Sequence, residues 1–76
     1  MNITERITIE PDKMGGRPCI RGMRITVGTI TGLFAAGRTR AEILELYPYL
    51  EDADLTAALN YATLLANDQD VPFERA

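Results

Sequence analysis

The segment GGRPCIRGMRITV, residues 15–27, contains three arginines and no carboxylate in a chain whose formal net charge is −3. Its glycines permit backbone conformations that other residues avoid, so we expect a turn at the paired glycines and a second turn at Gly22. Residues 19–20 and 25–27 are short apolar runs on the two sides of the second turn. The segment therefore predicts a small β-hairpin with Gly22 at positive φ.

The residues on either side of this segment have different periodicities. Apolar and polar residues alternate over residues 3–10, which is typical of a short strand. Apolar residues recur at helical spacing over residues 27–34, where Thr26 is placed to cap the helix and Gly37 to end it. A strand and a first helix are therefore expected around the hairpin.

Two glycines interrupt this first predicted helix. Gly28 and Gly32 each cost about 1 kcal/mol relative to alanine, and at four residues apart they share one face. We expect another backbone to pack closely against this face. A helix that is simply weak is the alternative.

Two further helices follow along the chain. Thr39 and Glu42 form a T-x-x-E capping box before an apolar run, which predicts a helix over residues 40–47 that stops at Pro48. The third and longest helix is expected over residues 51–67, with an apolar stripe of helical period. Its first turn carries negative charge, which suits the positive end of a helix dipole. The acidic residues are Glu51, Asp52 and Asp54.

These elements predict one domain, mostly α with a small N-terminal β-hairpin. Only about four residues join the second and third helices, so we expect a trihelical helix-turn-helix core of homeodomain-like type. Residues 1–67 are expected to form this single domain, and residues 68–76 a flexible C-terminal tail. A 76-residue chain buries only about 60% of its surface, so we also expect a homodimer.

Charge is distributed unevenly along the sequence. Residues 1–12 carry a balance of −2, residues 13–40 a balance of +6 and residues 41–76 a balance of −7. This asymmetry indicates two different partners, one for the basic part and one for the acidic part.

The composition argues against several classes of protein. The chain has no histidine and one cysteine, so it lacks a disulfide framework, a histidine-based zinc site and a histidine general base. We expect no cofactor, no metal and no enzymatic activity, and we expect Cys19 to be a small buried apolar residue. No apolar run approaches the roughly 18 residues of a membrane span and no signal peptide is recognisable, so we expect a cytoplasmic protein.

Two strings of residues resemble a known family. GGRPCIRGMRITV fits the pattern G-G-x-P-x-I-x-G-x-R-I-x-V, and AAGRTRAEILELYPYLEDADLTAALNYA fits the helical part that follows it. Over roughly residues 7–62, the chain thus resembles the family catalogued as domain of unknown function 433. It departs from the family's usual residues at Cys19, Met23 and Glu51, and Glu51 makes the start of the third helix more acidic.

The resemblance implies a function. Members of that family are commonly regarded as antitoxins of type II toxin–antitoxin pairs, with a PIN-like ribonuclease as the usual partner. We therefore expect a small dimeric protein that binds operator DNA and neutralises a PIN-like ribonuclease. The alternative is a protein-interaction module that binds no DNA and uses the helix-turn-helix only as a core.

The candidate nucleic-acid-binding residues are the arginines of the basic stretch: Arg17, Arg21, Arg24, Arg38 and Arg40. In helix-turn-helix docking, the start of the motif's second helix enters the major groove. Here that start carries three acids with no nearby base, which opposes DNA binding. We therefore expect the hairpin to supply most phosphate contacts, with Arg17 and Arg21 pointing outward and Arg24 bracing the fold. Pairing with the chain's own acids, or simple solvation, is the alternative for each arginine.

The C-terminal segment NDQDVPFERA is acidic and contains one phenylalanine. A segment of this kind can order on binding in the cationic or metal-bearing cleft of a ribonuclease. The candidate partner-binding residues are Asp68, Asp70 and Phe73. A disordered end without a partner is the alternative.

Overall fold

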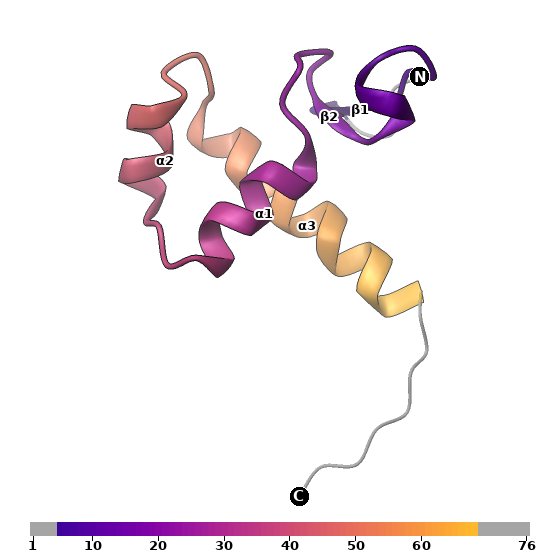
Figure 1. The fold of residues 1–76 in the computed structure, drawn as a ribbon. Helices are drawn as coiled ribbons and strands as arrows, with labels where there is room; N and C mark the ends of the chain where they lie inside the picture. The colour runs from indigo at the N-terminus through magenta and orange to yellow at the C-terminus, as the bar shows by residue number, and fades with distance from the viewer. Residues whose placement is uncertain (1–4, 69–76) are drawn as a thin grey trace, which may run out of the picture.

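The computed structural model describes residues 5–68, and Figure 1 shows their arrangement. A two-stranded antiparallel sheet precedes three helices. The elements in chain order are β1 (Ile7–Thr8), the 3-10 turn η1 (Met14–Gly16), β2 (Cys19–Ile20), α1 (Val27–Ala35), α2 (Arg40–Leu46) and α3 (Asp52–Asp68). The mostly helical architecture with an N-terminal β-hairpin is confirmed. The homeodomain-like helix-turn-helix assignment stays a prediction.

The strand pairing differs from the expected one. β2 pairs with β1, and Ile7 lies opposite Ile20. Residues 25–27, the expected partner of β2, also pair with this segment: the Ile20 N–H donates to the Ile25 carbonyl at 3.0 Å and the Val27 N–H donates to the Pro18 carbonyl at 2.9 Å. They form an isolated bridge between Thr26 and Cys19 and not a full strand. The reason is that the Thr26 side chain caps α1, so the chain turns into the helix before a second strand can extend.

A tight turn follows β2. The Met23 N–H donates to the Ile20 carbonyl at 2.8 Å, and the central residues Arg21 and Gly22 have φ values of 44° and 73°. Positive φ at both central positions is the type I′ pattern, so the prediction for Gly22 is confirmed. Arg21 also adopts this left-handed conformation, which costs a residue with a Cβ about 1–2 kcal/mol.

The predicted helix ends are confirmed in detail. At the start of α1 the Thr26 hydroxyl accepts from the Thr29 N–H at 3.0 Å. At α2 the Glu42 N–H donates to the Thr39 hydroxyl at 3.2 Å, and the Thr39 N–H donates to the Glu42 carboxylate at 2.8 Å. Gly37, with φ of 92°, follows the end of α1 and permits the change of direction towards α2.

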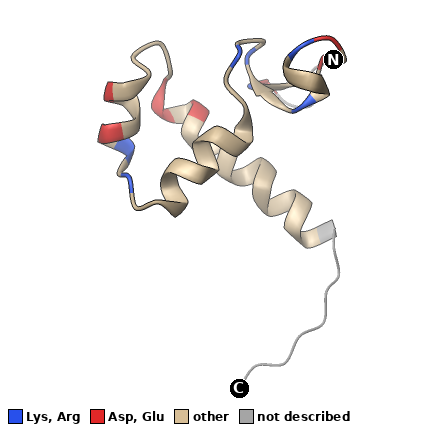
Figure 2. Ribbon diagram, viewed as in Figure 1, with Lys and Arg blue, Asp and Glu red and all other residues tan. Residues whose placement is uncertain are grey.

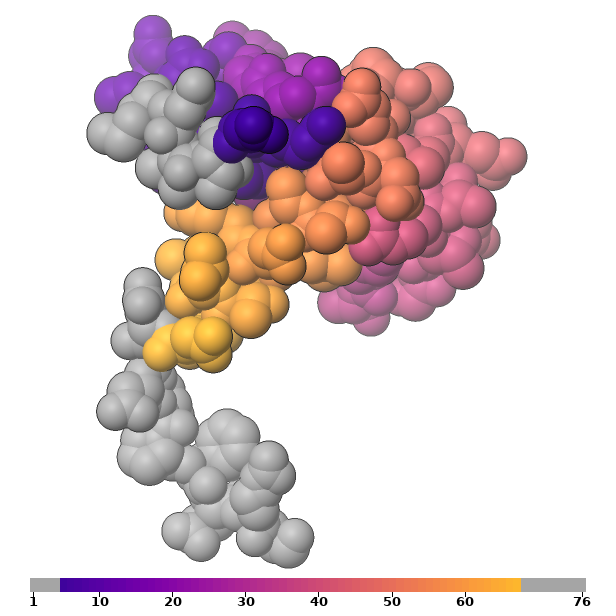
Figure 3. All heavy atoms as spheres, turned by 180° about the vertical axis from the view of Figure 1, so that it is seen from behind, coloured from indigo at the N-terminus to yellow at the C-terminus, as the bar shows by residue number. Residues whose placement is uncertain are grey.

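One apolar core joins the sheet to the helices. Its buried members are Ile7, Ile20, Ile25, Val27, Ile30, Ile43, Leu50, Leu55 and Ala58. α1 crosses α3, and the first half of α3 completes the core (Figure 1). The second half of α3 runs past the body of the domain (Figures 1 and 3), where Leu64 and Leu65 are 58% and 48% exposed. The apolar stripe predicted along the whole helix is therefore buried only in its first half.

The glycines of α1 do not meet another backbone. An added Cβ would have no atom within 4 Å at Gly32, and at Gly28 it would meet only the Thr26 hydroxyl at 3.8 Å. The expected close approach is therefore absent from residues 5–68. The reason is that Val27 and Ile30 occupy the inward side of α1 and the glycines lie on its other side.

The helices of the structure bear on two further expectations, a membrane span and the end of the domain. Among the helices of residues 5–68, none is both long enough and apolar enough to cross a membrane. α3 continues to Asp68, one residue beyond the predicted boundary, and the division into a domain and a tail stays a prediction. The predicted flexible tail falls on residues 69–76, which lie outside the described residues.

Candidate functional site

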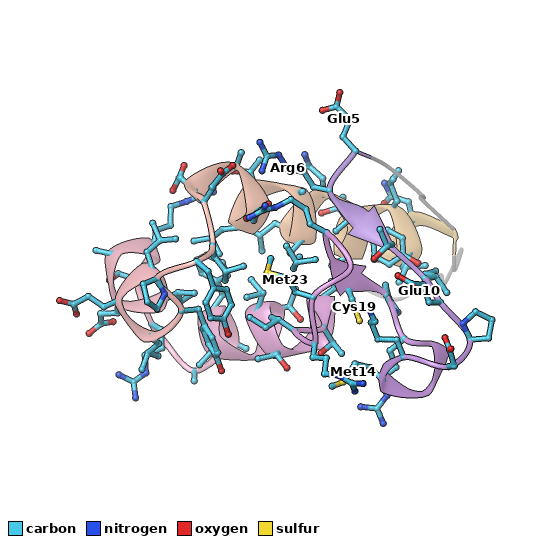
Figure 4. The ribbon with its side chains drawn as sticks, turned by 90° about the horizontal axis from the view of Figure 1, so that it is seen from above. Glu5, Arg6, Glu10, Met14, Cys19 and Met23 are labelled. Carbon is cyan, nitrogen blue, oxygen red and sulfur yellow. The ribbon has the colours of Figure 1, made fainter. Side chains whose placement is uncertain are left out.

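A buried carboxylate joins the β element to the start of α3. Asp54, in the first turn of α3, has no solvent exposure. Arg6 donates from Nη1 to Oδ1 at 2.8 Å, while Arg21 donates from Nε to Oδ1 at 3.0 Å and from Nη2 to Oδ2 at 2.8 Å. The Glu51 backbone N–H adds a fourth hydrogen bond at 2.8 Å. We call these four residues the Asp54 cluster. In Figure 4, Arg6 lies over the ribbon of α3, whereas the neighbouring Glu5 points away from the domain.

Pairing outweighs burial in setting the charge of Asp54. Burial by itself raises a carboxyl pKa, but the hydrogen bonds from Arg21, the Glu51 N–H and Arg6 hold the pKa of Asp54 below its ordinary value of 3.8. The hydrogen bonds to Asp54 in turn raise the pKa of both arginines. Asp54, Arg6 and Arg21 are therefore ionised at neutral pH.

The other acids at the start of α3 are also paired with arginines. Arg6 Nη1 lies 2.8 Å from Glu51 Oε1, and Arg40 Nη1 lies 2.9 Å from Asp52 Oδ1. The expectation of three acids with no nearby base is therefore wrong. The start of α3 repels a polyanion less than its sequence indicates, because each carboxylate has a cation in contact.

Two of the five predicted arginines are thereby used inside the fold. Arg21 belongs to the Asp54 cluster, and Arg40 connects α2 to α3, donating also to the Thr56 hydroxyl at 2.9 Å. The expected roles of the hairpin arginines are reversed. Arg21 braces the fold, while Arg24, which was expected to do so, is exposed.

The other three candidates are exposed. Arg17, Arg24 and Arg38 form no ion pair with any described residue. Arg17 and Arg24 belong to the β end of the domain, whereas Arg38 lies in the α1–α2 turn at the opposite end, and Figure 2 shows basic residues at both ends. The candidate arginines do not form a single patch on one copy of the chain.

Arg24 lines a cavity with a cationic and aromatic wall. The cavity measures about 430 Å³ and is lined by Lys13, Gly22, Met23, Arg24, Ile25 and Tyr49. Tyr49 is 56% exposed as a residue, and its ring meets the Tyr47 ring edge to face, with the ring centroids 6.2 Å apart. Lys13 is held by the Gly22 carbonyl and lies 3.7 Å from the Glu10 carboxylate, so Arg24 is the unneutralised cation of this site. We call it the Arg24 cavity. In a site lined by both groups, a guanidinium can contact a phosphate and a phenol ring can stack on a base.

Arg6, Lys13 and Tyr49 are site residues that the sequence did not predict. One local signal pointed towards the Asp54 cluster: Asp54 stands three residues after Glu51, where a side chain can accept from the N–H of the helix cap. No local pattern connects this position with arginines 33 and 48 residues earlier in the chain.

The remaining predictions concern the C-terminal partner-binding residues, Cys19 and metal ligands. The Asp68 side chain, Asp70 and Phe73 lie outside the described residues, so their partner-binding role stays a prediction. Cys19 is only 2% exposed, as expected of a small buried apolar residue. No group of three potential metal ligands occurs within residues 5–68.

Known proteins resemble this chain in both sequence and fold. Residues 7–62 match the model of the family described as "Protein of unknown function (DUF433)". The uncharacterized protein y4eO of Sinorhizobium fredii is 36% identical over 58 residues, which make up 76% of this chain and only 26% of that relative. The crystal structure of a DUF433 member from Anabaena variabilis superposes with a TM-score of 0.77 at 35% identity, covering 83% of this chain and 62% of that one. The family model spans most of the sequence and the solved member shares its fold, so the chain belongs to the DUF433 family.

Proposed function

We propose that this protein is an antitoxin-type protein that binds operator DNA through its basic β end and neutralises a PIN-like ribonuclease through its acidic C-terminal part. The observation that carries the DNA-binding half is the Arg24 cavity, which is lined both by Arg24, exposed and without an ion pair to any residue of 5–68, and by the exposed Tyr49. The family resemblance supports the nuclease half. In this proposal the protein is a cytoplasmic homodimer without enzymatic activity or cofactor.

The β end is a better DNA contact than the start of α3. The carboxylates of α3 are neutralised by arginines, so the helix start has little net charge to attract or repel phosphate. Arg24 is exposed at this end of the domain and forms no ion pair with any residue of 5–68. Phosphate contacts by such residues release counterions and supply most of the sequence-independent affinity.

The test compares single arginine substitutions in a DNA-binding titration over a range of salt concentrations. The probe is the DNA immediately upstream of the protein's own coding region. Arg24→Ala is expected to weaken binding about tenfold and to reduce the salt slope by about 1. Arg38→Ala is the matched control, since Arg38 is equally exposed and unpaired within residues 5–68 but lies at the other end of the domain. Equal effects of the two substitutions would rule out the Arg24 cavity as the contact.

The nuclease half has a separate test. Deleting residues 67–76 removes Asp68, Asp70 and Phe73, and it is expected to abolish inhibition of a PIN-like ribonuclease while DNA binding is retained. Equal loss of both activities would contradict this division of labour.

A protein-interaction module that binds no DNA is the second candidate. It is favoured by the internal use of Arg21 and Arg40, which leaves fewer cations for phosphate than the sequence contains. A gel shift at physiological salt, with and without the ribonuclease, separates the two functions. Absence of any shift in both conditions favours the second candidate.

A further inference from the structure

Two segments that lie along α1 and α3 contain no charged residue. Residues 27–37 and 55–67 contain no aspartate, glutamate, lysine or arginine, although a quarter of all residues in the chain are charged (25%). The exposed positions of both segments carry glycine, alanine, threonine, asparagine or leucine side chains. A surface of this composition is typical of one that another protein covers.

A groove runs between these two helices. It encloses about 480 Å³, and its lining residues are Arg17, Pro18, Thr26, Val27, Gly28, Thr29, Thr31, Tyr61, Ala62 and Leu65. The lining is mainly apolar, with Arg17 as its one charged member. Leu65 is 48% exposed within this lining, and its neighbour Leu64 is 58% exposed. We call this the α1–α3 groove.

We propose that the α1–α3 groove binds the second half of α3 from a second copy of this chain, in a twofold-symmetric dimer. An occupant that fits this lining is mainly apolar, because Arg17 is its one charged member and most of the exposed lining surface is apolar. The chain itself presents such an element directly beside the groove, since the second half of α3 is uncharged to residue 67 and projects beyond the domain (Figures 1 and 3). With twofold symmetry, each protruding helix fills the groove of the other copy, and both exposed leucine pairs are buried together.

The length of the protruding helix and the area of a standard interface set the scale of such a dimer. A helix of 17 residues is about 25 Å long, so its second half adds about 12 Å beyond the core contacts. A standard interface buries about 800 Å² on each partner, which is roughly one-seventh of the 5296 Å² surface of the chain. The surface that such an interface covers would consist of the uncharged second half of α3 and one face of α1.

The dimer does not depend on DNA binding. The α1–α3 groove and the Arg24 cavity share no lining residue. The proposed interface therefore leaves the Arg24 cavity of each copy open. Self-association can therefore be measured without DNA and without the ribonuclease.

The experiment is sedimentation equilibrium of the full chain and of three single variants, with helix content measured by circular dichroism. Leu64→Glu and Leu65→Glu place a charge in the interface, and each is expected to raise the dimer dissociation constant at least about tenfold with unchanged helix content. Leu46→Glu is the matched control, because Leu46 is 53% exposed on α2, outside the groove lining. The Leu46→Glu variant is expected to have the same dimer dissociation constant as the unmodified chain.

A cysteine pair tests the identity of the occupant. Mixing a Gly28→Cys copy with a Leu64→Cys copy is expected to give an intermolecular disulfide, and the native Cys19 does not interfere because it is 2% exposed. A chain that stays monomeric at about 100 μM, or a dimer weakened as much by Leu46→Glu as by Leu64→Glu, would overturn the proposal. Failure of the mixed pair to cross-link in a dimer would also overturn it.

Discussion

Replacing Asp54 with asparagine measures how strongly the β element is held to the helices. The carboxylate is fully buried and accepts four hydrogen bonds, three of them from arginines. Removing one partner of a buried ion pair costs about 3–5 kcal/mol. The Arg6 and Arg21 side chains are 30% and 35% exposed and can regain water, so we expect a smaller loss of about 2–3 kcal/mol in the free energy of unfolding. The total for a domain of this size is about 4–11 kcal/mol, so the loss is a large part of it.

The loss has a defined pH dependence. The pKa of Asp54 is lower in the folded protein than its ordinary value of 3.8, so the unfolded chain binds the proton more tightly. Ionised Asp54 therefore stabilises the fold fully above about pH 5, and this stabilisation disappears as the pH falls through the lowered pKa. The difference between the unmodified chain and Asp54→Asn should be constant from pH 7 to about pH 5 and should shrink at more acidic pH.

The assay is urea denaturation followed by circular dichroism at pH 7, 5, 4 and 3, at one protein concentration. Asp52→Asn is the control, since its carboxylate is 65% exposed and contacts only the exposed side of Arg40. We expect it to change the free energy of unfolding by less than about 0.5 kcal/mol. A loss below about 0.5 kcal/mol for Asp54→Asn at pH 7, or a loss that stays constant down to pH 3, would refute the reasoning.

Three substitutions test the local structure by the same denaturation measurement. Gly22→Ala should lower the free energy of unfolding by about 1–2 kcal/mol, because φ at this position is 73°, and a neutral result would contradict the type I′ turn. Thr39→Ala removes half of the capping box of α2 and should cost about 1 kcal/mol. Gly32→Ala should raise stability by up to about 1 kcal/mol at low protein concentration, since the added Cβ meets no atom within 4 Å; a loss there would show a close neighbour at this face.

The parts of the fold that depend on nearby residues were predictable from the sequence. The caps at Thr26 and Thr39, the positive φ of Gly22 and the ends of the three helices all follow from contacts within a few residues. Such contacts leave a readable pattern, because the donor and the acceptor stand at a fixed spacing along the chain.

The parts that depend on distant residues were not predictable in the same way. β2 pairs with β1, which is distant from it in the sequence, and the cap at Thr26 competes with a strand over residues 25–27. The role of Arg21 depends on Asp54, 33 residues later, and no spacing rule links the two. Charge counted along the sequence therefore overstated both the basic surface of the hairpin and the acidity of α3.

The Asp54 cluster also determines which arginine variants can report on DNA binding. Arg21 lies in the turn whose next residues line the Arg24 cavity, and its bond to Asp54 fixes that turn against α3. Arg21→Ala is therefore expected to lower stability and the fraction of active protein while the salt slope of DNA binding stays unchanged, because no phosphate contact is removed. Arg24→Ala should leave stability unchanged and reduce the slope by about 1. A reduced slope for Arg21→Ala, measured well below its unfolding midpoint, would show that this guanidinium contacts phosphate in addition to holding Asp54.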